Sequence, residues 1–144
     1  FAAGRLQTGG RASGVAQAAL EAAAIYAGEC KQFGRPIGDF QLTQHKLGRM
    51  ATPLAPARQL TYAAARAMDA DESVSLEPSM AKLFACDVAV WVAQEGQLLQ
   101  GGWGYAEEFP ISRYVVDAQV LPIFEGVKPI LELKVIARGL LGRS

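Results

Sequence analysis

Apolar side chains recur every three to four residues along three long stretches of the chain, which is the spacing of an amphipathic helix. The first stretch predicts a helix from about residue 15 to residue 33, preceded by a loose segment of small residues, Gly9–Gly14. Gly34, with Pro36 two residues later, ends this helix. Its many alanines would let a partner helix approach closely.

The second stretch predicts a helix from Phe40 to Met68 that contains Pro53 and Pro56. We expect a bend or a break there, because a proline inside a helix removes a backbone hydrogen bond at a cost of about 3 kcal/mol. The third predicted helix opens at Glu77, with a proline in the tolerated first turn, and ends at the glycine-rich turn Gly101–Tyr105.

The last part of the chain predicts one more amphipathic helix, from Pro129 to Gly142, after a connector in which residues 112–120 allow a short helix. The sequence shows no strand pattern. Three long helices and a shorter one, joined by short turns, predict an all-α, up-and-down four-helix bundle. With 144 residues, the chain is long enough for one domain, covering residues 1–144, and too short for two.

Composition narrows the class of protein. The 14 basic and 14 acidic residues balance, which argues against a nucleic-acid surface and gives no sign of an electrostatic membrane anchor. The sequence has no run of 18 apolar residues, so no transmembrane span is predicted. The chain is nevertheless 51% hydrophobic, and we expect some apolar surface to be buried against other subunits or domains. It begins with Phe1 rather than Met, and we take it as a piece of a longer polypeptide.

Cysteine and histidine usage favours a reduced compartment and no metal. Cys30 and Cys86 are far apart and form no CxxC pair, so we expect free thiols in a cytoplasmic or mitochondrial-matrix protein. His45 is the single histidine and has no partner residues for catalysis nearby in the sequence. One histidine and scattered acids predict no metal site.

Glu125 is the candidate catalytic residue. It follows Ile123 and Phe124 and precedes Gly126 and Val127. A lone carboxylic acid in an apolar setting can have a raised pKa and act as a base. The alternative is that this acid merely begins the last helix, where the helix dipole favours a negative charge. On the residues alone, the second interpretation is the more common one.

An ordered set of short motifs runs along the chain: Gly14-Val15-Ala16-Gln17, Phe33-Gly34-Arg35-Pro36-Ile37, Phe40-Gln41, Lys82, Gly101-Gly102-Trp103-Gly104-Tyr105, Asp117-Ala118, Ile123-Phe124-Glu125-Gly126 and Ile136-Ala137-Arg138. Each motif alone is weak evidence. Together, in this order and at these spacings, they resemble the C-terminal helical domain of the flavin-dependent acyl-CoA dehydrogenases over essentially the whole chain.

The resemblance implies a reaction and a set of sites. In that family the acid of the (Tyr/Phe)-Glu-Gly segment removes the α-proton of an acyl-CoA thioester, a β-hydride goes to FAD, and a trans-2-enoyl-CoA results. The family's thioester carbonyl is polarised by the backbone N–H of the base residue and a flavin hydroxyl. Carried over, Glu125 is the catalytic base; the expected substrate-binding residues are Arg5, Gly126 and Tyr105, and the expected FAD contacts are Phe33, Gln41, Gly101 and Gly102.

Other positions depart from the family pattern. Cys30, Leu98 and Val116 stand where the family has Arg, Gln and Arg, respectively. Val127 and Pro129 replace a Thr-x-Gln that often follows the acid. These changes remove charge-assisted and amide contacts to the FAD of a neighbouring subunit. Three explanations remain open: a subunit of a hetero-oligomer, a diverged homologue without flavin, or an engineered fragment.

Two hypotheses of different classes follow. The first is the C-terminal domain of an acyl-CoA dehydrogenase of fatty acid metabolism, a dimer or tetramer that passes electrons to electron-transfer flavoprotein and acts on short or branched acyl-CoA, methylsuccinyl-CoA included. The resemblance also implies an N-terminal helical domain and a middle β-domain outside these 144 residues. The second is an oligomerisation and scaffold module without flavin. FAD titration and size-exclusion mass discriminate between them.

Overall fold

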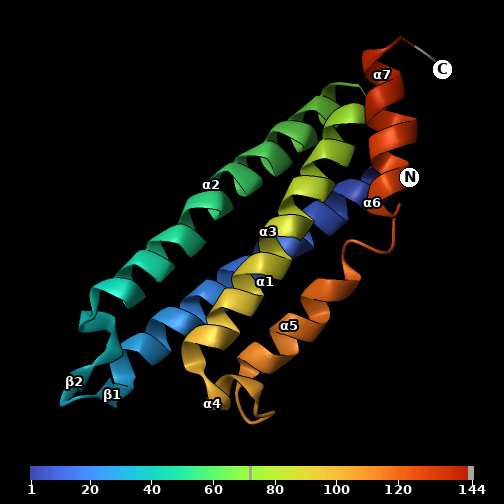
Figure 1. The fold of residues 1–144 in the computed structure, drawn as a ribbon. Helices are drawn as coiled ribbons and strands as arrows, with labels where there is room; N and C mark the ends of the chain where they lie inside the picture. The colour runs from blue at the N-terminus through green and yellow to red at the C-terminus, as the bar shows by residue number, and fades with distance from the viewer. Residues whose placement is uncertain (72, 143–144) are drawn as a thin grey trace.

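The computed structural model describes residues 1–71 and 73–142, and it is an all-α bundle. Helices α1 (Ala2–Glu29), α2 (Gln41–Ala70), α3 (Leu76–Gln100) and α5 (Pro110–Val120) lie side by side and alternate in direction (Figure 1). The predicted up-and-down four-helix bundle is therefore confirmed.

Helix α1 begins at Ala2, so the prediction of a loose segment at Gly9–Gly14 is wrong. The Thr8 hydroxyl donates to the Gly4 carbonyl oxygen at 2.8 Å, within the helix. A Cβ placed on Gly9 would lie 3.6 Å from the backbone of Ala81 in α3. Gly9 is thus part of the surface on which α3 packs, because the lack of a side chain lets two helices approach closely.

Helix α2 runs without interruption through Pro53 and Pro56, so the predicted break is wrong. Its buried positions follow helical spacing on both sides of the prolines, from Met50 to Ala64. Packing of this face offsets the backbone hydrogen bonds that the prolines cannot make. The turn before α2 also contains a structure that the sequence pattern did not predict, a minimal antiparallel hairpin of β1 (Lys31–Gln32) and β2 (Arg35–Pro36), followed by the 3₁₀ turn η1 (Ile37–Asp39).

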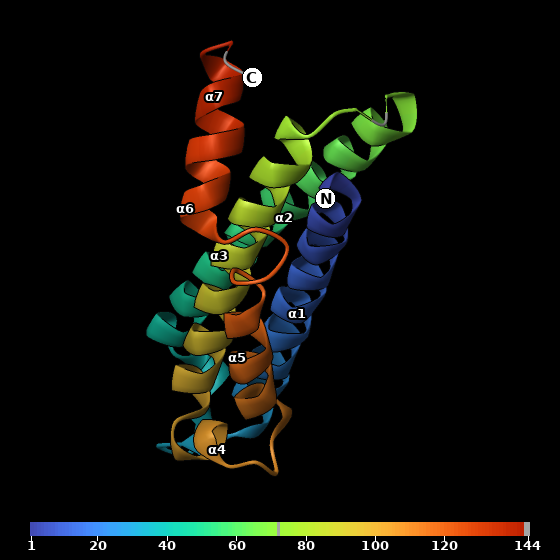
Figure 2. The same ribbon diagram turned by 90° about the vertical axis from the view of Figure 1, so that its right-hand side faces the viewer.

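The fourth helix of the bundle is α5, not the C-terminal helix. Ile111, Val115 and Ala118 of α5 are buried in the core. The C-terminal helix consists of α6 (Lys128–Ile130), the π-helical segment η2 (Leu131–Ala137) and α7 (Arg138–Leu140). It buries only Leu131 and extends beyond the other helices (Figure 2). A short helix, α4 (Gly102–Tyr105), turns the chain from α3 to α5.

Small residues, among them Ala19 and Gly96, line the contact between α1 and α3. A Cβ on Gly96 would lie 3.0 Å from Ile111 Cδ1 and 3.3 Å from the Ala19 carbonyl oxygen. These distances show that α1, α3 and α5 meet closely at this level of the bundle. In the described part of the chain, no helix is both long enough and apolar enough to cross a membrane.

Candidate functional site

The loop between α5 and α6 carries the predicted base. Within it, Glu125 has φ 55° and Gly126 has φ 100°. A left-handed conformation costs a residue with a side chain about 1–2 kcal/mol. Glycine is required at the second position, because a Cβ there would lie 2.7 Å from Leu131 Cδ2. The conformation of the loop is thus fixed by packing against the start of the C-terminal helix.

The Glu125 carboxylate lies directly against the first turn of α1. A Cβ added to Gly4 would lie 2.6 Å from Glu125 Cδ and would also collide with Oε2. Only a glycine on this face of α1 leaves room for the acid. The fold therefore brings together two ends of the chain that the sequence separates.

The apolar neighbours of Glu125 do not shield it within this chain. Glu125 is exposed, and the side chains of Ile123 and Val127 are 64% and 44% exposed. Only Phe124 packs against the core. The apolar setting expected for Glu125 is therefore not provided by Ile123 and Val127, because these two side chains are exposed.

Lys82 on α3 is a charged residue that binds the loop. Lys82 is fully buried, and its Nζ donates to the Gly126 carbonyl oxygen at 2.5 Å and to the Pro122 carbonyl oxygen at 3.4 Å. Burial lowers the pKa of Lys82; the nearby Arg5 charge also lowers it, whereas Cys86 and Glu125 raise it. Sequence reasoning noted Lys82 only as part of a motif, since a lysine in a helix ordinarily lies on the surface.

Arg5 lies one residue after Gly4 and completes this group. Its Nη1 donates to the Ser79 Oγ at 3.3 Å, and that hydroxyl donates to the Ser75 carbonyl oxygen at 2.6 Å. The Arg5 Nε is buried and has no acceptor among the residues that the structure describes. A buried N–H without a partner costs about 1–3 kcal/mol.

The predicted FAD contacts lie elsewhere, around the hairpin and α4. Phe33 is 95% exposed with φ 54°, and its ring meets the Phe40 ring edge-on at 6.2 Å. Arg35 stacks over the Phe40 ring at 4.2 Å. Gln41 is exposed at the start of α2, and Gly101 is exposed with φ 60°.

These two groups occupy opposite ends of the bundle (Figure 2). Helix α1 carries Gly4 near one end and Glu29, just before the hairpin, at the other. At 1.5 Å per residue, these positions are separated by about 40 Å. Helix α4, which contains Gly102 and Tyr105, lies at the same end of the bundle as the hairpin (Figure 2). Tyr105 is 84% exposed. The structure therefore brings Arg5 and Gly126 together with Glu125, and it places Tyr105 with the expected FAD contacts.

The positions that depart from the family pattern are accessible. Leu98 and Val116 are each 66% exposed, and Val127 is 44% exposed. Cys30 is half-buried beside the hairpin, and Pro129 is exposed at the start of the C-terminal helix. Apolar side chains thus stand on the surface where polar contacts were expected.

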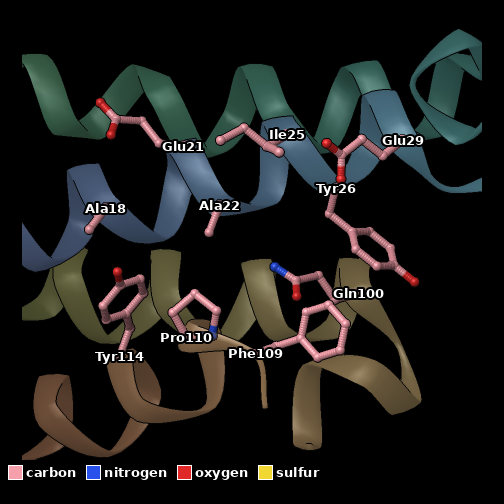
Figure 3. A pocket seen from close by; sticks show the side chains of 10 residues that line it. All are labelled: Ala18, Glu21, Ala22, Ile25, Tyr26, Glu29, Gln100, Phe109, Pro110 and Tyr114. Carbon is pink, nitrogen blue, oxygen red and sulfur yellow. The ribbon is translucent and has the colours of Figure 1, made fainter. Parts of the chain in front are cut away.

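A groove of about 320 Å³ lies between α1 and α5 near the hairpin end (Figure 3). Its walls are mostly apolar, with Ala22 and Ile25 from α1 facing Phe109 and Pro110. The Gln100 side chain points into it from the end of α3. Glu125 is not part of its lining. Among the described residues, no group of three or more His, Cys, Asp and Glu side chains is arranged to hold a metal ion.

Comparison with known proteins identifies the family. The model for "Acyl-CoA dehydrogenase, C-terminal domain" matches residues 1–141. The chain belongs to the acyl-CoA dehydrogenase family. The resemblance seen in the sequence motifs is therefore confirmed, and so is the all-α class of this domain.

Members of the acyl-CoA dehydrogenase family align along nearly the whole chain. The (2S)-methylsuccinyl-CoA dehydrogenase of Cereibacter sphaeroides is 46% identical over 142 residues, which cover 98% of this chain and 26% of that protein. Butyryl-CoA dehydrogenase from Megasphaera elsdenii superposes with a TM-score of 0.91 at 35% identity, covering 97% of this chain and 36% of that one. A glutaryl-CoA dehydrogenase from Mycobacterium smegmatis, solved in complex with FADH2, has a TM-score of 0.90 at 28% identity over 96% of this chain and 36% of that one. The chain thus spans between 26% and 36% of the length of these relatives.

Proposed function

We propose that this chain is the C-terminal domain of an FAD-dependent acyl-CoA dehydrogenase in which Glu125 removes the α-proton of an acyl-CoA thioester. One observation carries the proposal: in a member of this family, the fold holds the Glu125 carboxylate against Gly4, beside Arg5. These residues supply an acid–base group and a cation at one surface. The single domain predicted for residues 1–144 is part of the same proposal.

The chemistry requires what this surface offers. The α-proton of a thioester is poorly acidic, so its removal needs a positioned carboxylate and a polarised carbonyl. The proton goes to the Glu125 carboxylate, and the backbone N–H of Glu125 polarises the thioester oxygen. Gly126 leaves room for the acyl group, and the Arg5 guanidinium supplies a positive charge for an acceptor oxygen of the CoA portion. FAD, when bound, accepts the β-hydride, which leaves a trans-2-enoyl-CoA.

The residues of the hairpin end fit one edge of a flavin nucleotide. The ring of Phe33 is almost fully exposed and free to stack, and Gln41 presents an exposed amide. A Cβ on Gly101 or Gly102 would meet nothing within 4 Å, so backbone is accessible there. Leu98 offers no polar atom beside them. We infer that this end supplies stacking and backbone contacts to FAD, whereas charge-assisted contacts come from elsewhere.

Because the two ends lie about 40 Å apart along α1, one chain cannot bring both to the same active site. We infer that Glu125 serves one active site and the hairpin end contributes to that of a neighbouring subunit in a dimer or tetramer. Exposed apolar side chains support association; Leu42 is 76% exposed and Leu140 is 71% exposed.

The similarity to a methylsuccinyl-CoA dehydrogenase supports a short or branched acyl-CoA as substrate. Electron-transfer flavoprotein is the proposed electron acceptor. We further infer that the 144 residues do not turn over acyl-CoA by themselves, because the acid is exposed without other domains. Bound flavin together with enoyl-CoA formation by this isolated chain would contradict that inference.

The decisive experiment replaces Glu125 in the intact protein. Glu125→Gln keeps the shape and removes the proton acceptor, so we expect α-proton exchange in D₂O and enoyl-CoA formation to slow by about 10⁴-fold while the fold is retained. Glu107→Gln, at an exposed acid near α4, is the matched control and should keep the activity. Retained activity in Glu125→Gln would refute the assignment.

A scaffold role without flavin remains the second candidate, because apolar Leu98 and Val116 stand exposed where polar FAD contacts were expected. Titration of the intact protein with FAD decides between the two. Saturable binding with a flavin absorption change supports the enzyme, and an assembly that binds no FAD supports the scaffold.

A further inference from the structure

Lys82 is a buried cation whose two hydrogen bonds both go to the loop that carries Glu125. The residue is fully buried in α3, and its Nζ reaches the carbonyl oxygens of Gly126 at 2.5 Å and Pro122 at 3.4 Å. Burying an ammonium group is unfavourable unless hydrogen bonds compensate for the lost water. An apolar residue would fill the same space without this cost, so the cation has a specific effect on the loop.

The two carbonyls lie on either side of Glu125, and the backbone there is strained. Glu125 and Gly126 both have positive φ, at 55° and 100°. A residue with a side chain is strained in this region and stays there only when its surroundings hold it. Backbone bonds secure the two ends of the loop, from Ile123 N to Val120 O at 3.0 Å and from Ile130 N to Val127 O at 3.0 Å. Lys82 holds the middle of the loop against α3.

The charges around Lys82 agree with this role. Its pKa is lowered mainly by burial, while the negative charge of Glu125 favours its protonated form. Arg5 is held to the same helix one turn earlier through Ser79. The loop is therefore joined to α3 through the hydrogen bonds of Lys82, and α1 is joined to α3 through Arg5.

We propose that Lys82 is the positioning residue of the active site, which holds the main chain on both sides of Glu125 so that the carboxylate stays against Gly4. This proposal rests on the proposed role of Glu125 as the base. Lys82 touches neither substrate nor cofactor in this scheme. It acts by keeping the acid in place, where a displacement of about 1 Å lowers a rate by about 100-fold.

The test compares three variants of the intact protein. Lys82→Met keeps the volume of the side chain and removes the charge and both hydrogen bonds. Lys82→Gln removes the charge, keeps an amide NH₂ donor group on a shorter side chain, and carries the test if Lys82→Met does not fold. Met50→Ala, at a fully buried position in α2, is the matched control for lost stability. Met50 lies near Gly96, about 20 Å along α3 from Lys82.

Two readouts separate positioning from a structural role. Amide hydrogen exchange of residues 122–127 should become faster in Lys82→Met and stay unchanged in Met50→Ala. The kcat should fall by about 100-fold in Lys82→Met with KM within about twofold, whereas Met50→Ala should keep kcat. Unchanged loop exchange in Lys82→Met would overturn the proposal, and so would a full kcat with a mobile loop.

The double variant distinguishes this proposal from the one on which it rests. If Lys82 acts through Glu125, adding Lys82→Met to Glu125→Gln should change the residual rate by less than about threefold, because the effects of residues that act as a unit are not additive. A further drop of about 100-fold would overturn the positioning role while leaving Glu125 as the base. An active Glu125→Gln variant would refute the function itself, and the positioning role with it.

Discussion

Replacing Gly4 with alanine should separate the stability of the protein from its activity. The new Cβ would lie 2.6 Å from Glu125 Cδ. Carbon atoms at rest are separated by at least about 3.5 Å, so the carboxylate must move by about 1 Å. It can do so at little cost in stability, because Glu125 is exposed and its side chain is flexible.

The expected magnitudes have opposite signs. Alanine favours a helix over glycine by up to about 1 kcal/mol, so the free energy of unfolding should stay constant or rise slightly. A misplacement of about 1 Å should lower kcat by about 100-fold, which corresponds to about 2.7 kcal/mol in the activation free energy. Thermal unfolding and the rate of α-proton exchange in D₂O, both on the intact protein, measure the two effects.

The control is Gly10→Ala in the same helix. Gly10 is exposed, and a Cβ there would meet nothing within 4 Å. This variant should gain similar helix stability and keep full activity. If Gly4→Ala retained the kcat of the parent protein, the position of the Glu125 carboxylate beside α1 would have no bearing on the reaction.

Three further predictions concern the scaffold. Gly96→Val should lower the free energy of unfolding by about 1–3 kcal/mol in chemical denaturation, because its Cβ would crowd Ile111 at 3.0 Å; Gly48→Ala, in open space on α2, should not lower it. Pro53→Ala should raise the free energy of unfolding by about 2 kcal/mol. Removing a proline from a helix interior relieves a cost of about 3 kcal/mol, and the greater freedom of the unfolded chain takes back up to about 1 kcal/mol. A lower free energy of unfolding would show that the proline stabilises the fold. Burial raises the pKa of the Cys86 thiol from 9.0 to about 11, so the folded state retains this proton longer than the unfolded state, and stability should fall between about pH 9 and pH 11. Cys86→Ala should reduce this alkaline loss, and an unaltered pH profile would exclude Cys86 as its source.

Periodic apolar positions were enough to predict the long helices and the all-α bundle. The sequence pattern failed where small residues are compatible with both a loop and a close helix–helix contact. Gly9, which reads as part of a loose start of α1, is in close contact with Ala81 of α3. The choice of α5 as the fourth helix also depends on tertiary packing, since the C-terminal helix has an amphipathic pattern too but buries only Leu131.

For the site, the motif that contains Glu125 was visible in the sequence, but its surroundings were not. Proximity to Gly4 depends on the return of α5 along α1, which no local pattern encodes. Lys82 could not be singled out, because nothing in the sequence shows that a charged residue in the middle of a helix is fully buried. The exposure of Glu125 was equally hidden, since neighbouring apolar residues do not reveal which way their side chains face.

Glu125 and the hairpin β1–β2 lie at opposite ends of the bundle, and this separation has a genetic consequence. If each active site takes its acid from one subunit and its hairpin contacts to FAD from another, substitutions at the two ends of one chain affect two different active sites. Chains that carry Glu125→Gln and chains that carry Phe33→Ala would each assemble into inactive or weakened enzymes. In mixed assemblies, some sites would combine an intact acid with an intact hairpin, and activity would be restored by intersubunit complementation.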